Sequence, residues 1–450
     1  NEKPEPLSDA GQQIARVREY AAPPEILPLK TLIPSVEQTG NFTILVVDDE
    51  PVNRQVLVNH LSQNNYAVVT ASDGFQALSA VERRKPDLIL LDIMMPRMSG
   101  YEVCQKLRQH YSPNELPVVM LTAKNQVDNL VEGFKTGAND YLPKPFSKDE
   151  LLARMQTHLR LSQMNLASSR FVPDEFLSFL QKGSIVDINL GDQISKEMTV
   201  MFSDLRGFTT ISETMTPQEN FDFVNSYLKR VSPVIREHQG FIVKYLGDGI
   251  MAVFPARADD ALQAAIETLN RVAEYNSYRK TRGRLPIQVG IGVHTGYMMV
   301  GMVGEANRMQ GDAFSDDVNL TSRLEGLTKF YQVSCIITAE TYQRLANPGE
   351  YNIRFLDRVR VKGKNEEVEL YEVFDADSPD LRALKQETQD DLAEAQRLYY
   401  AQQFDEAQVQ LFKVLQRSPK DKVAWHYLGQ ATRWLEERVE ENWTGVTVMT

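Results

Sequence analysis

Residues 243–254 read VKYLGDGIMAVF, in which one acid, Asp248, stands between two glycines that separate two apolar runs. Apolar runs around a short turn that contains glycine predict a β-hairpin. Lys244 adds a positive charge four residues before the acid. A buried hairpin has no structural need for two charges near its tip, because charged side chains are rarely buried without a partner. The segment therefore indicates a binding site as well as a fold.

A second segment has the same design. Residues 201–209 read MFSDLRGFT, so that an apolar strand again ends in an acid, Asp204, before a turn that contains glycine. If the two strands lie side by side, Asp204 and Asp248 converge at one edge of the sheet. Two carboxylates at one place can hold hard divalent cations, and those cations can hold a triphosphate.

Two further segments complete the pattern. Residues 312–323 read DAFSDDVNLTSR, and its Asn319 and Arg323 lie four residues apart, so they share one face of a helix. Residues 361–364 read VKGK. With these four segments in this order, the chain resembles the class III nucleotidyl cyclases over roughly residues 195–375.

This resemblance implies a catalytic domain at residues 196–375 with a ferredoxin-like α+β fold. It also implies two Mg²⁺ or Mn²⁺ ions held by Asp204, Asp248 and the carbonyl of Leu205. In the reaction implied, the ribose 3′-oxygen of ATP attacks the α-phosphorus of the same molecule and releases pyrophosphate.

The resemblance assigns roles to other residues of the segments. Arg323 would stabilise the charge at phosphorus, and Asn319 would orient the ribose. Lys362 and backbone N–H groups near Phe208 and Thr209 would hold the phosphates. In this family the metal acids come from one subunit and the Asn, Arg and base-reading residues from the other. A homodimer with two sites is therefore expected.

The resemblance also places Lys244 and Asp312 at the base. Lys donates a hydrogen bond and Asp accepts one, which matches the acceptor N1 and the donor N6 of adenine, whereas guanine reverses both. Guanylate cyclases commonly carry Glu in place of this Lys. The simpler alternatives are a solvated strand residue for Lys244 and a turn residue after Gly311 for Asp312. Tyr297 departs from the pattern, because some members have an Arg there that contacts phosphate.

Upstream, short apolar runs alternate with helical patterns. The strongest runs are residues 44–47, 88–91 and 118–121. Such alternation predicts a doubly wound parallel sheet, with its chemistry at the carboxyl ends of the strands. Five polar residues follow the expected strands there: Asp48, Asp49, Asp92, Thr122 and Lys144.

This set, with LDIMMP at residues 91–96 and LPKPF at 142–146, resembles the response-regulator receiver domain over residues 42–162. The resemblance implies that Asp92 accepts a phosphoryl group from a histidine kinase or another phosphodonor. It implies a Mg²⁺ site formed by Asp48, Asp49, Asp92 and Met94. It also implies that Thr122 and Lys144 bind the phosphoryl group and that Tyr141 is the residue that changes its side-chain conformation as the switch. A helix N-cap before Pro51 is the alternative role for Asp48 or Asp49.

The remaining segments connect or extend these domains. Residues 1–41 are expected to form a linker, because prolines interrupt them repeatedly. Residues 163–195 are expected to form a helical linker, either as a dimer seam or as an ordinary last receiver helix with a loop. Residues 381–440 predict a short helical tail that resembles a little more than one tetratricopeptide unit. The tail would pack on the cyclase, act as a docking cap, or be an incomplete repeat.

Net charge, cysteine content and hydrophobicity limit the possible partners and cellular location of the protein. The net charge of −12 argues against nucleic acid as a main partner, because binding phosphate backbones requires a basic face. The two cysteines, Cys104 and Cys335, lie far apart in the sequence, which points to a reducing compartment. No apolar run of about 20 residues and no signal peptide are present, so a cytoplasmic location without a membrane span is expected.

The sequence therefore predicts an adenylate cyclase that is regulated by phosphorylation. The alternatives are a degenerate cyclase that binds ATP and acts as a signalling scaffold, and a guanylate cyclase. A diguanylate cyclase would require a Gly-Gly-acid-Glu-Phe hairpin, and residues 246–250 read LGDGI. A scaffold whose tail docks a partner is a further alternative.

Overall fold

The computed structural model describes residues 42–123, 136–213, 215–361, 367–437, 439 and 443–449. These residues divide into two compact units, of which the first ends at Ala167 and the second begins at Ser168. The linker expected at residues 1–41 lies outside the described residues. In the part of the chain that is described, no helix is long and apolar enough to cross a membrane.

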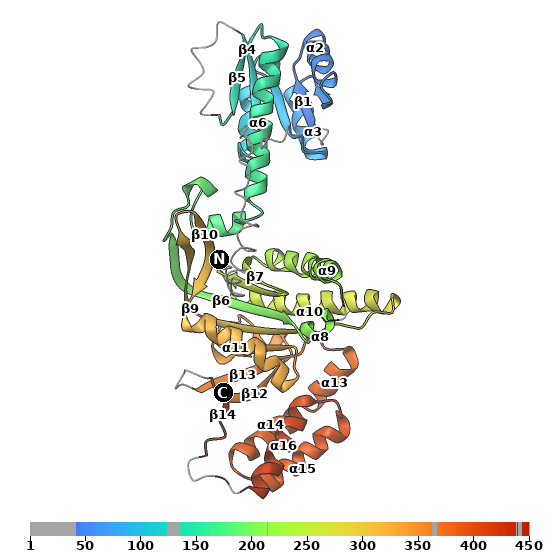
Figure 1. The fold of residues 1–450 in the computed structure, drawn as a ribbon, viewed down its shortest axis with the longest axis vertical. Helices are drawn as coiled ribbons and strands as arrows, with labels where there is room; N and C mark the ends of the chain where they lie inside the picture. Colours follow the sequence, from blue (N-terminus) through green and yellow to red (C-terminus); the bar gives the residue numbers. More distant parts are fainter. Residues whose placement is uncertain are drawn as a thin grey trace, which may run out of the picture. The chain divides into compact units, whose positions relative to one another are not determined.

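A five-stranded parallel sheet in the order β2-β1-β3-β4-β5 forms the first unit (Figure 1). Its elements are β1 (Thr43–Val47), α2 (Pro51–Ser62), β2 (Ala67–Ala71), α3 (Gly74–Arg83), β3 (Leu88–Asp92), α4 (Gly100–Arg108), β4 (Val118–Ala123), β5 (Asp140–Lys144) and α6 (Lys148–Ser168). Along β3, Leu88 and Leu90 pack with α2 and α6, whereas Ile89 and Leu91 pack with α3 and α4. A continuous apolar run suits a strand that is covered on both faces. The predicted doubly wound parallel sheet is confirmed.

Nine strands form the sheet of the second unit, in the order β14-β12-β13-β11-β9-β6-β8-β7, with β10 paired to β9. The strands are β6 (Gln193–Leu205), β7 (Phe241–Leu246), β8 (Gly249–Phe254), β9 (Val289–Glu305), β10 (Arg308–Phe314), β11 (Cys335–Thr338), β12 (Ile353–Val361), β13 (Glu367–Val373) and β14 (Thr447–Met449). Residues 196–375, for which the sequence predicts a catalytic domain, are called the catalytic segment. Its helices are α8 (Phe208–Ser212), α9 (Pro217–Glu237), α10 (Ala258–Thr281), α11 (Asp316–Tyr331) and α12 (Ala339–Arg344).

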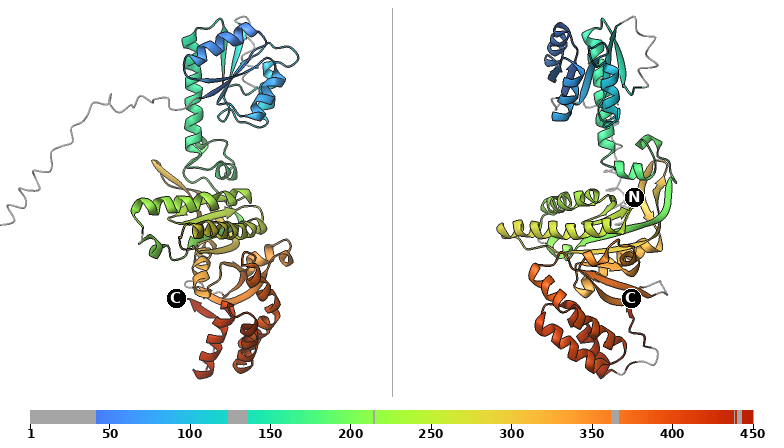
Figure 2. Two further views of the ribbon diagram at one scale, coloured as in Figure 1. Left: turned by 90° about the vertical axis from the view of Figure 1, so that its right-hand side faces the viewer. Right: turned by 180° about the vertical axis from the view of Figure 1, so that it is seen from behind.

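The centre of this sheet has a ferredoxin-like arrangement. The chain runs β6-α9-β7-β8-α10-β9, and its four strands lie in the order β9-β6-β8-β7 with antiparallel neighbours. Helices α9 and α10 lie side by side on one face (Figure 2), where Phe223 and Tyr227 pack with Met201 and Ile250. A capping box between Thr216 and Glu219 begins α9. The predicted α+β class is confirmed.

The opposite face is covered by α7 (Asp174–Phe179), from the segment expected to be a linker. The ring of Phe176 packs edge-on against Phe241 of β7, with 5.6 Å between centroids. It also lies so close to Gly311 of β10 that a Cβ there would stand 2.9 Å from the ring. Residues 193–195 belong to β6. The second half of the expected linker is therefore part of the core of the second unit.

The tail contains four helices, α13 (Pro379–Glu387), α14 (Gln389–Tyr400), α15 (Phe404–Arg417) and α16 (Lys422–Glu436). Their apolar faces share one core with Leu320, Leu324 and Leu327 of α11. Strand β14 then pairs in parallel with β12. The predicted bounds of 381–440 are corrected, because the helices of the tail begin at Pro379 and its described part extends to Met449. Of the alternatives for the tail, the structure agrees with packing on the catalytic segment.

Buried polar contacts join the tail to the sheet. Arg354 of β12 binds Glu372 at 2.6 Å and both carboxylate oxygens of Asp421 at 2.6 and 2.9 Å. Lys385 of α13 binds Glu372 and Asp377, each at 2.6 Å. These ion pairs are almost completely buried, so each charge depends on its partner.

A second buried acid, Asp357 of β12, connects three parts of the unit. It accepts hydrogen bonds from Tyr331 at the end of α11 (2.6 Å), from Tyr400 of α14 (2.7 Å) and from Thr447 of β14 (2.8 Å). Only 2% of Asp357 is exposed. One side chain thus fixes the end of α11 relative to the tail and to the last strand.

Candidate functional site

Strand pairing brings the two predicted metal acids together. Asp204 is the second-last residue of β6, and Asp248 lies in the turn between β7 and β8. Because β6 and β8 pair antiparallel, with Ser203 opposite Ile250, both acids reach the same edge of the sheet. Gly247 has φ +69°, a conformation that favours glycine, so the turn explains one glycine of the VKYLGDGIMAVF segment. A Cβ at Gly249 would lie 3.1 Å from Oδ1 of Asp204, which explains the other.

The electrostatics of this edge favour a cation. Burial and the charge of Asp248 raise the pKa of Asp204 to about 6, and burial also raises the pKa of Asp248. The Oδ2 atom of Asp248 is buried and has no hydrogen-bond partner. A divalent ion would relieve the repulsion between the carboxylates and coordinate this oxygen. The donor set, carboxylates with the nearby Leu205 carbonyl, suits Mg²⁺ or Mn²⁺.

Two charged residues that the sequence interpretation missed lie near the acids. Glu325 is half-buried on α11, and burial, followed by the charges of Asp204 and Asp248, raises its pKa to about 7. Arg206 follows Asp204 by two residues and donates hydrogen bonds to the carbonyl oxygens of Thr328, at 2.9 Å, and Val333. Helical spacing was the available signal, because Glu325 is four residues from the buried Thr321 and therefore on the sheet-facing side.

Asn319 and Arg323 lie on the exposed side of α11. The helix begins where the Ser315 hydroxyl accepts a hydrogen bond from the N–H of Val318 at 3.1 Å. Its buried side faces β9 and the tail, through residues such as Leu320. The predicted common face of Asn319 and Arg323 is therefore present, and it is directed away from the core of its own chain.

The two predicted base-reading residues form an ion pair. Lys244 of β7 places its Nζ 2.8 Å from each carboxylate oxygen of Asp312 on β10. Asp312 is buried within a strand and also accepts a hydrogen bond from the N–H of Ala313 at 2.8 Å. The alternative of a turn aspartate is therefore wrong, whereas Lys244 is a strand residue whose side chain remains 35% exposed. One donor and one acceptor are held side by side.

The predicted phosphate-binding residues are only partly described. Phe208 and Thr209 begin α8, directly after Gly207, and the ring of Phe208 stacks on Phe223 with 6.3 Å between centroids. Lys362 lies outside the described residues. Tyr297, the departure from the family pattern, is exposed on β9.

In the first unit, the predicted acids form one cluster. Oxygen atoms of Asp48, Asp49 and Asp92 all lie within 4.8 Å of one another. Lys144 binds Asp48 at 2.7 Å and Asp92 at 3.0 Å. Burial raises the pKa of Asp92, and the nearby Lys144 opposes this rise. The N-cap of α2 is Glu50, without a side-chain cap, so the capping alternative for Asp48 and Asp49 is wrong.

The other receiver residues surround this cluster. Thr122 is buried near the end of β4, in the strand next to the one that ends in Asp92. Met94 is exposed in the loop after β3. Tyr141 of β5 lies in the core on the side of α3 and α4, and burial raises its pKa to about 12. The carboxyl ends of the strands thus gather Asp48, Asp49, Asp92, Thr122 and Lys144 at one edge of the sheet, whereas Tyr141 lies nearer the start of β5.

Comparisons with known proteins agree with this division. Residues 44–156 match the response regulator receiver domain, and residues 191–374 match the adenylate and guanylate cyclase catalytic domain. An adenylate cyclase from Anabaena cylindrica is 39% identical over 234 residues, which are 50% of this chain and 47% of that protein. The chain thus spans about half the length of this curated relative.

Two further similarities concern the separate units. The response regulator MprA from Mycobacterium sp. (strain KMS) is 39% identical over 206 residues, which are 44% of this chain and 79% of that protein. The crystal structure of the guanylyl cyclase Cya2 is 31% identical, covers 40% of this chain and 92% of its own, and has a TM-score of 0.36.

Proposed function

Because the chain belongs to the response regulators and carries an adenylate and guanylate cyclase catalytic domain, we propose that it converts ATP to 3′,5′-cyclic AMP and pyrophosphate under the control of aspartyl phosphorylation. The observation that carries the cyclase assignment is the buried pair of Asp204 and Asp248, with an unpartnered Oδ2 on Asp248. The ion pair of Lys244 and Asp312 favours ATP over GTP.

The catalytic residues would act as follows. Asp204, Asp248 and the Leu205 carbonyl would hold two Mg²⁺ or Mn²⁺ ions, which supply a lower pKa for the ribose 3′-hydroxyl and neutralise the leaving pyrophosphate. Arg323 stabilises the negative charge that develops at the α-phosphorus, and Asn319 orients the ribose so that its 3′-oxygen is in line. The 3′-oxygen bond to phosphorus forms as the bond to pyrophosphate breaks.

Substrate contacts away from the reacting atoms would fix the nucleotide. Lys244 donates to N1 of adenine, and Asp312 accepts from the N6 amino group, once the base separates the two side chains. Lys362 and the backbone N–H groups of Phe208 and Thr209 bind the phosphate oxygens. A site of this kind rejects guanine, because the donor Lys244 would face the donor N1–H of guanine and the acceptor Asp312 would face the acceptor O6.

A homodimer would complete the site. Asn319 and Arg323 lie on the exposed side of α11, which fits residues that serve a second subunit. Each chain carries both the metal acids and the residues that complete them, so a symmetric pair would contain two sites.

Product analysis is the direct test of this proposal. The full chain is incubated with Mg²⁺ or Mn²⁺ and with ATP or GTP in separate reactions, and nucleotides are separated by chromatography. Cyclic AMP as the main product is expected. Cyclic GMP as the main product would establish the guanylate cyclase alternative, and ATP binding without any product would establish the scaffold alternative.

Exchange of the base-reading pair should change nucleotide preference. In Lys244→Glu with Asp312→Ser, the donor and acceptor that match adenine are both removed. We expect the ratio of kcat/KM for ATP to that for GTP to fall by about 100-fold or more, since such hydrogen bonds contribute several kcal/mol to discrimination. Lys229→Glu, which makes the same charge change on the exposed side of α9, should leave the ratio unchanged. An unchanged ratio in the double variant would refute the assignment of these residues.

Phosphorylation of Asp92 should change the cyclase rate. In the proposed step, the Asp92 carboxylate attacks the phosphorus of a phosphodonor such as a histidine kinase, and the donor leaves. The new group adds almost two negative charges, which attract Lys144 and the Thr122 hydroxyl, and Tyr141 follows as the switch. Because catalysis across two subunits depends on alignment, we expect a change of up to about 100-fold in kcat, in either direction.

The measurement compares cyclic AMP formation with and without beryllofluoride, in the wild type and in Asp92→Asn. A response in the wild type that is lost in Asp92→Asn is expected. Glu82→Gln, which removes an exposed acid on α3, should respond as the wild type does. The same response in the wild type and in Asp92→Asn would mean that the receiver does not act through this residue.

A further inference from the structure

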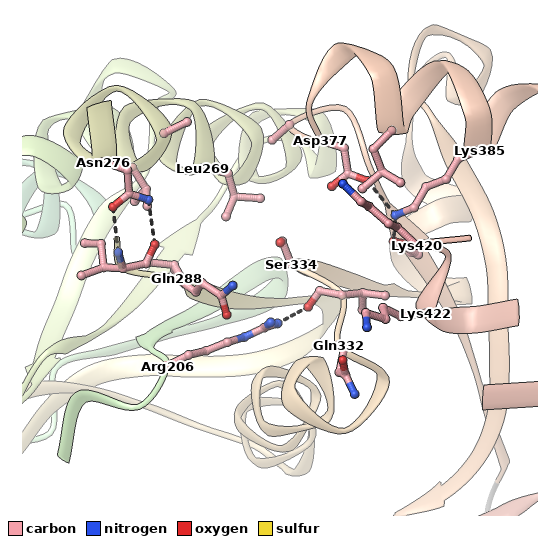
Figure 3. Close-up of a pocket in the computed structure, with 18 residues that line it drawn as sticks. Arg206, Leu269, Asn276, Gln288, Gln332, Ser334, Asp377, Lys385, Lys420 and Lys422 are labelled. Carbon is pink, nitrogen blue, oxygen red and sulfur yellow. Dashed lines mark hydrogen bonds and ion pairs between the residues drawn. The ribbon is translucent and has the colours of Figure 1, made fainter. Parts of the chain in front are cut away.

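A cavity of about 490 Å³ lies within the second unit, between the catalytic segment and the tail (Figure 3). Arg206, Gln288 and Ser334 line it from the catalytic segment, and Lys385, Lys420 and Lys422 line it from the tail. In Figure 3 the side chains of Arg206 and Gln288 extend toward the open centre, with the tail lysines on the opposite wall. The volume is within the range of small-molecule sites, about 300–1,000 Å³.

The three acids around this cavity pair with only two cations, Arg354 and Lys385. Glu372 and Asp377 both bind Lys385 at 2.6 Å, and Glu372 also binds Arg354. Asp421, which lies between Lys420 and Lys422 in the sequence, binds Arg354 through both of its oxygens. Glu372 and Asp377 also line the cavity, with their charges paired to Lys385 and Arg354, whereas Asp421 is completely buried and is not among the lining residues.

Arg206, Lys420 and Lys422 form no ion pair with any described residue. The guanidinium of Arg206 donates only to two carbonyl oxygens, and its Nε is buried without a hydrogen-bond partner. The acid whose charge acts on Arg206 is Glu325, which is itself affected by the charges of the metal acids. The cavity and its network together contain five cations and three acids, a net charge of about +2, which is unexpected in a chain of net charge −12.

We propose that this cavity binds a phosphate-bearing small molecule. A phosphate group presents several charged oxygens, which can reach cations on two walls at once, whereas one carboxylate would balance only one of them. The Gln288 amide and the Ser334 hydroxyl supply neutral donors on the same surface. Apolar side chains such as Leu269, Val272 and Leu381 complete the lining and can contact the body of an organic phosphate.

The position of the cavity gives the ligand a route to the catalytic residues. The N–H of Arg206 donates to the Gln288 carbonyl at 2.9 Å, and Arg206 follows the metal acid Asp204 by two residues. Ser334 follows the end of α11, the helix that carries Asn319 and Arg323. A ligand that joins these segments to the tail would therefore change kcat. This effect on the rate rests on the proposed cyclase function, whereas binding to the cavity does not.

Binding is tested by titration calorimetry on the full chain in buffer with EDTA, which removes divalent metal from the cyclase site. The probes are inorganic phosphate, pyrophosphate and AMP. The first two test binding of a free inorganic phosphate species, and AMP tests binding of an organic phosphate ester. We expect at least one probe to bind, and Lys420→Gln with Lys422→Gln to weaken that binding by about tenfold or more. Lys413→Gln, an exposed lysine of α15 outside the cavity, is the matched control and should bind as the wild type does.

Absence of heat for all three probes up to about 10 mM would overturn the proposed site. Equal affinity in the wild type and the double variant would overturn it as well, since the ligand would then be bound elsewhere. The rate is measured separately at saturating ATP and Mg²⁺, with the bound probe present. A change in kcat that the double variant lacks supports the coupling, and binding without that change would overturn the coupling alone.

Discussion

Asp204→Asn and Asp248→Asn should each reduce cyclic nucleotide formation by at least about a thousandfold, equivalent to about 4 kcal/mol of transition-state stabilisation. Each substitution keeps the shape of the side chain and removes one charged ligand for divalent metal. The initial rate is measured with Mg²⁺ and with Mn²⁺. Asp222→Asn, an exposed acid on α9, serves as the control and should retain full activity. Substantial activity in either site variant would contradict the two-metal proposal.

The same substitution has a second expected effect, on stability. The pKa of Asp204 is raised in the folded protein to about 6, so its ionised form is disfavoured there and folding is weakened as pH rises from about 4 through 6. Asp204→Asn should therefore raise the melting temperature of the metal-free protein at pH 7.5, a pH about 1.5 units above that pKa. Near pH 4 the substitution should have little effect on the melting temperature. Loss of activity with a lower melting temperature at pH 7.5 would point to misfolding instead.

Mixed dimers test the proposed sharing of sites. Asp204→Asn chains and Arg323→Ala chains should each be inactive alone. Random mixing should restore about a quarter of wild-type activity, because about half of the dimers are mixed and each of these has one intact site. Demonstrated mixed dimers without activity would refute the shared-site arrangement.

Asp421→Ala should have the largest effect on stability. Burial opposes ionisation of Asp421, but the hydrogen bonds and charge of Arg354 outweigh it and lower the pKa. Removal of the acid leaves the Arg354 guanidinium buried beside Glu372 alone. It also removes the cap of α16, because Asp421 accepts hydrogen bonds from the N–H groups of Val423 and Ala424 at 3.1 and 3.2 Å. We expect the free energy of unfolding of the second unit to fall by about 3–5 kcal/mol.

Denaturant unfolding of the full chain provides the measurement, with kcat measured under conditions where the variant is folded. Because the tail shares a core with Leu320 and Leu324 of α11, kcat should fall as well. Asp391→Ala is the matched control in the same tail, since its ion pair with Arg417 is exposed and should contribute less than about 1 kcal/mol. A similar loss in both variants would mean that the buried network has no special role.

The sequence predicted best those features that depend on local pattern. Continuous apolar runs such as residues 88–91 indicated buried parallel strands, because no other common element combines that length with that composition. The polar residues after those strands were expected together because the carboxyl ends of parallel strands meet at one edge of the sheet. In the second unit the pairing of Asp204 with Asp248 followed from two strands that end in an acid.

Features that depend on distant neighbours were missed. The apolar pattern predicts two strands at residues 288–295 and 298–303, with a break at Gly296 and Tyr297, but β9 is continuous through both residues. These residues pair with Met198 and Glu197 of β6, which supports an extended backbone where the local sequence suggests a break. A Cβ at Gly296 would lie 2.3 Å from Oδ2 of Asp317, so a larger residue there would displace that side chain.

The tail was misjudged for the same physical reason. Arg354 and Asp421 are separated by 67 residues. A charged residue considered by itself is expected on the surface, so the sequence did not indicate that these two are buried together. Strand β14 has only three residues, too few for a pattern to indicate a strand. The ion pair of Lys244 with Asp312 joins positions 68 residues apart, so only the resemblance to a family suggested that they meet.

The contacts of Asp357 determine where this protein can be truncated or fused to another protein. A shortened version that stops near residue 375 would lose Tyr400 and Thr447 and expose the leucines of α11 to water. We therefore expect the tail through Met449 to be needed with the catalytic segment in any transfer, and a different sensory module is best joined near Ser168, where the second unit begins. A fusion at the other end must follow β14, so a reporter protein belongs after residue 449 and not between the catalytic segment and its tail.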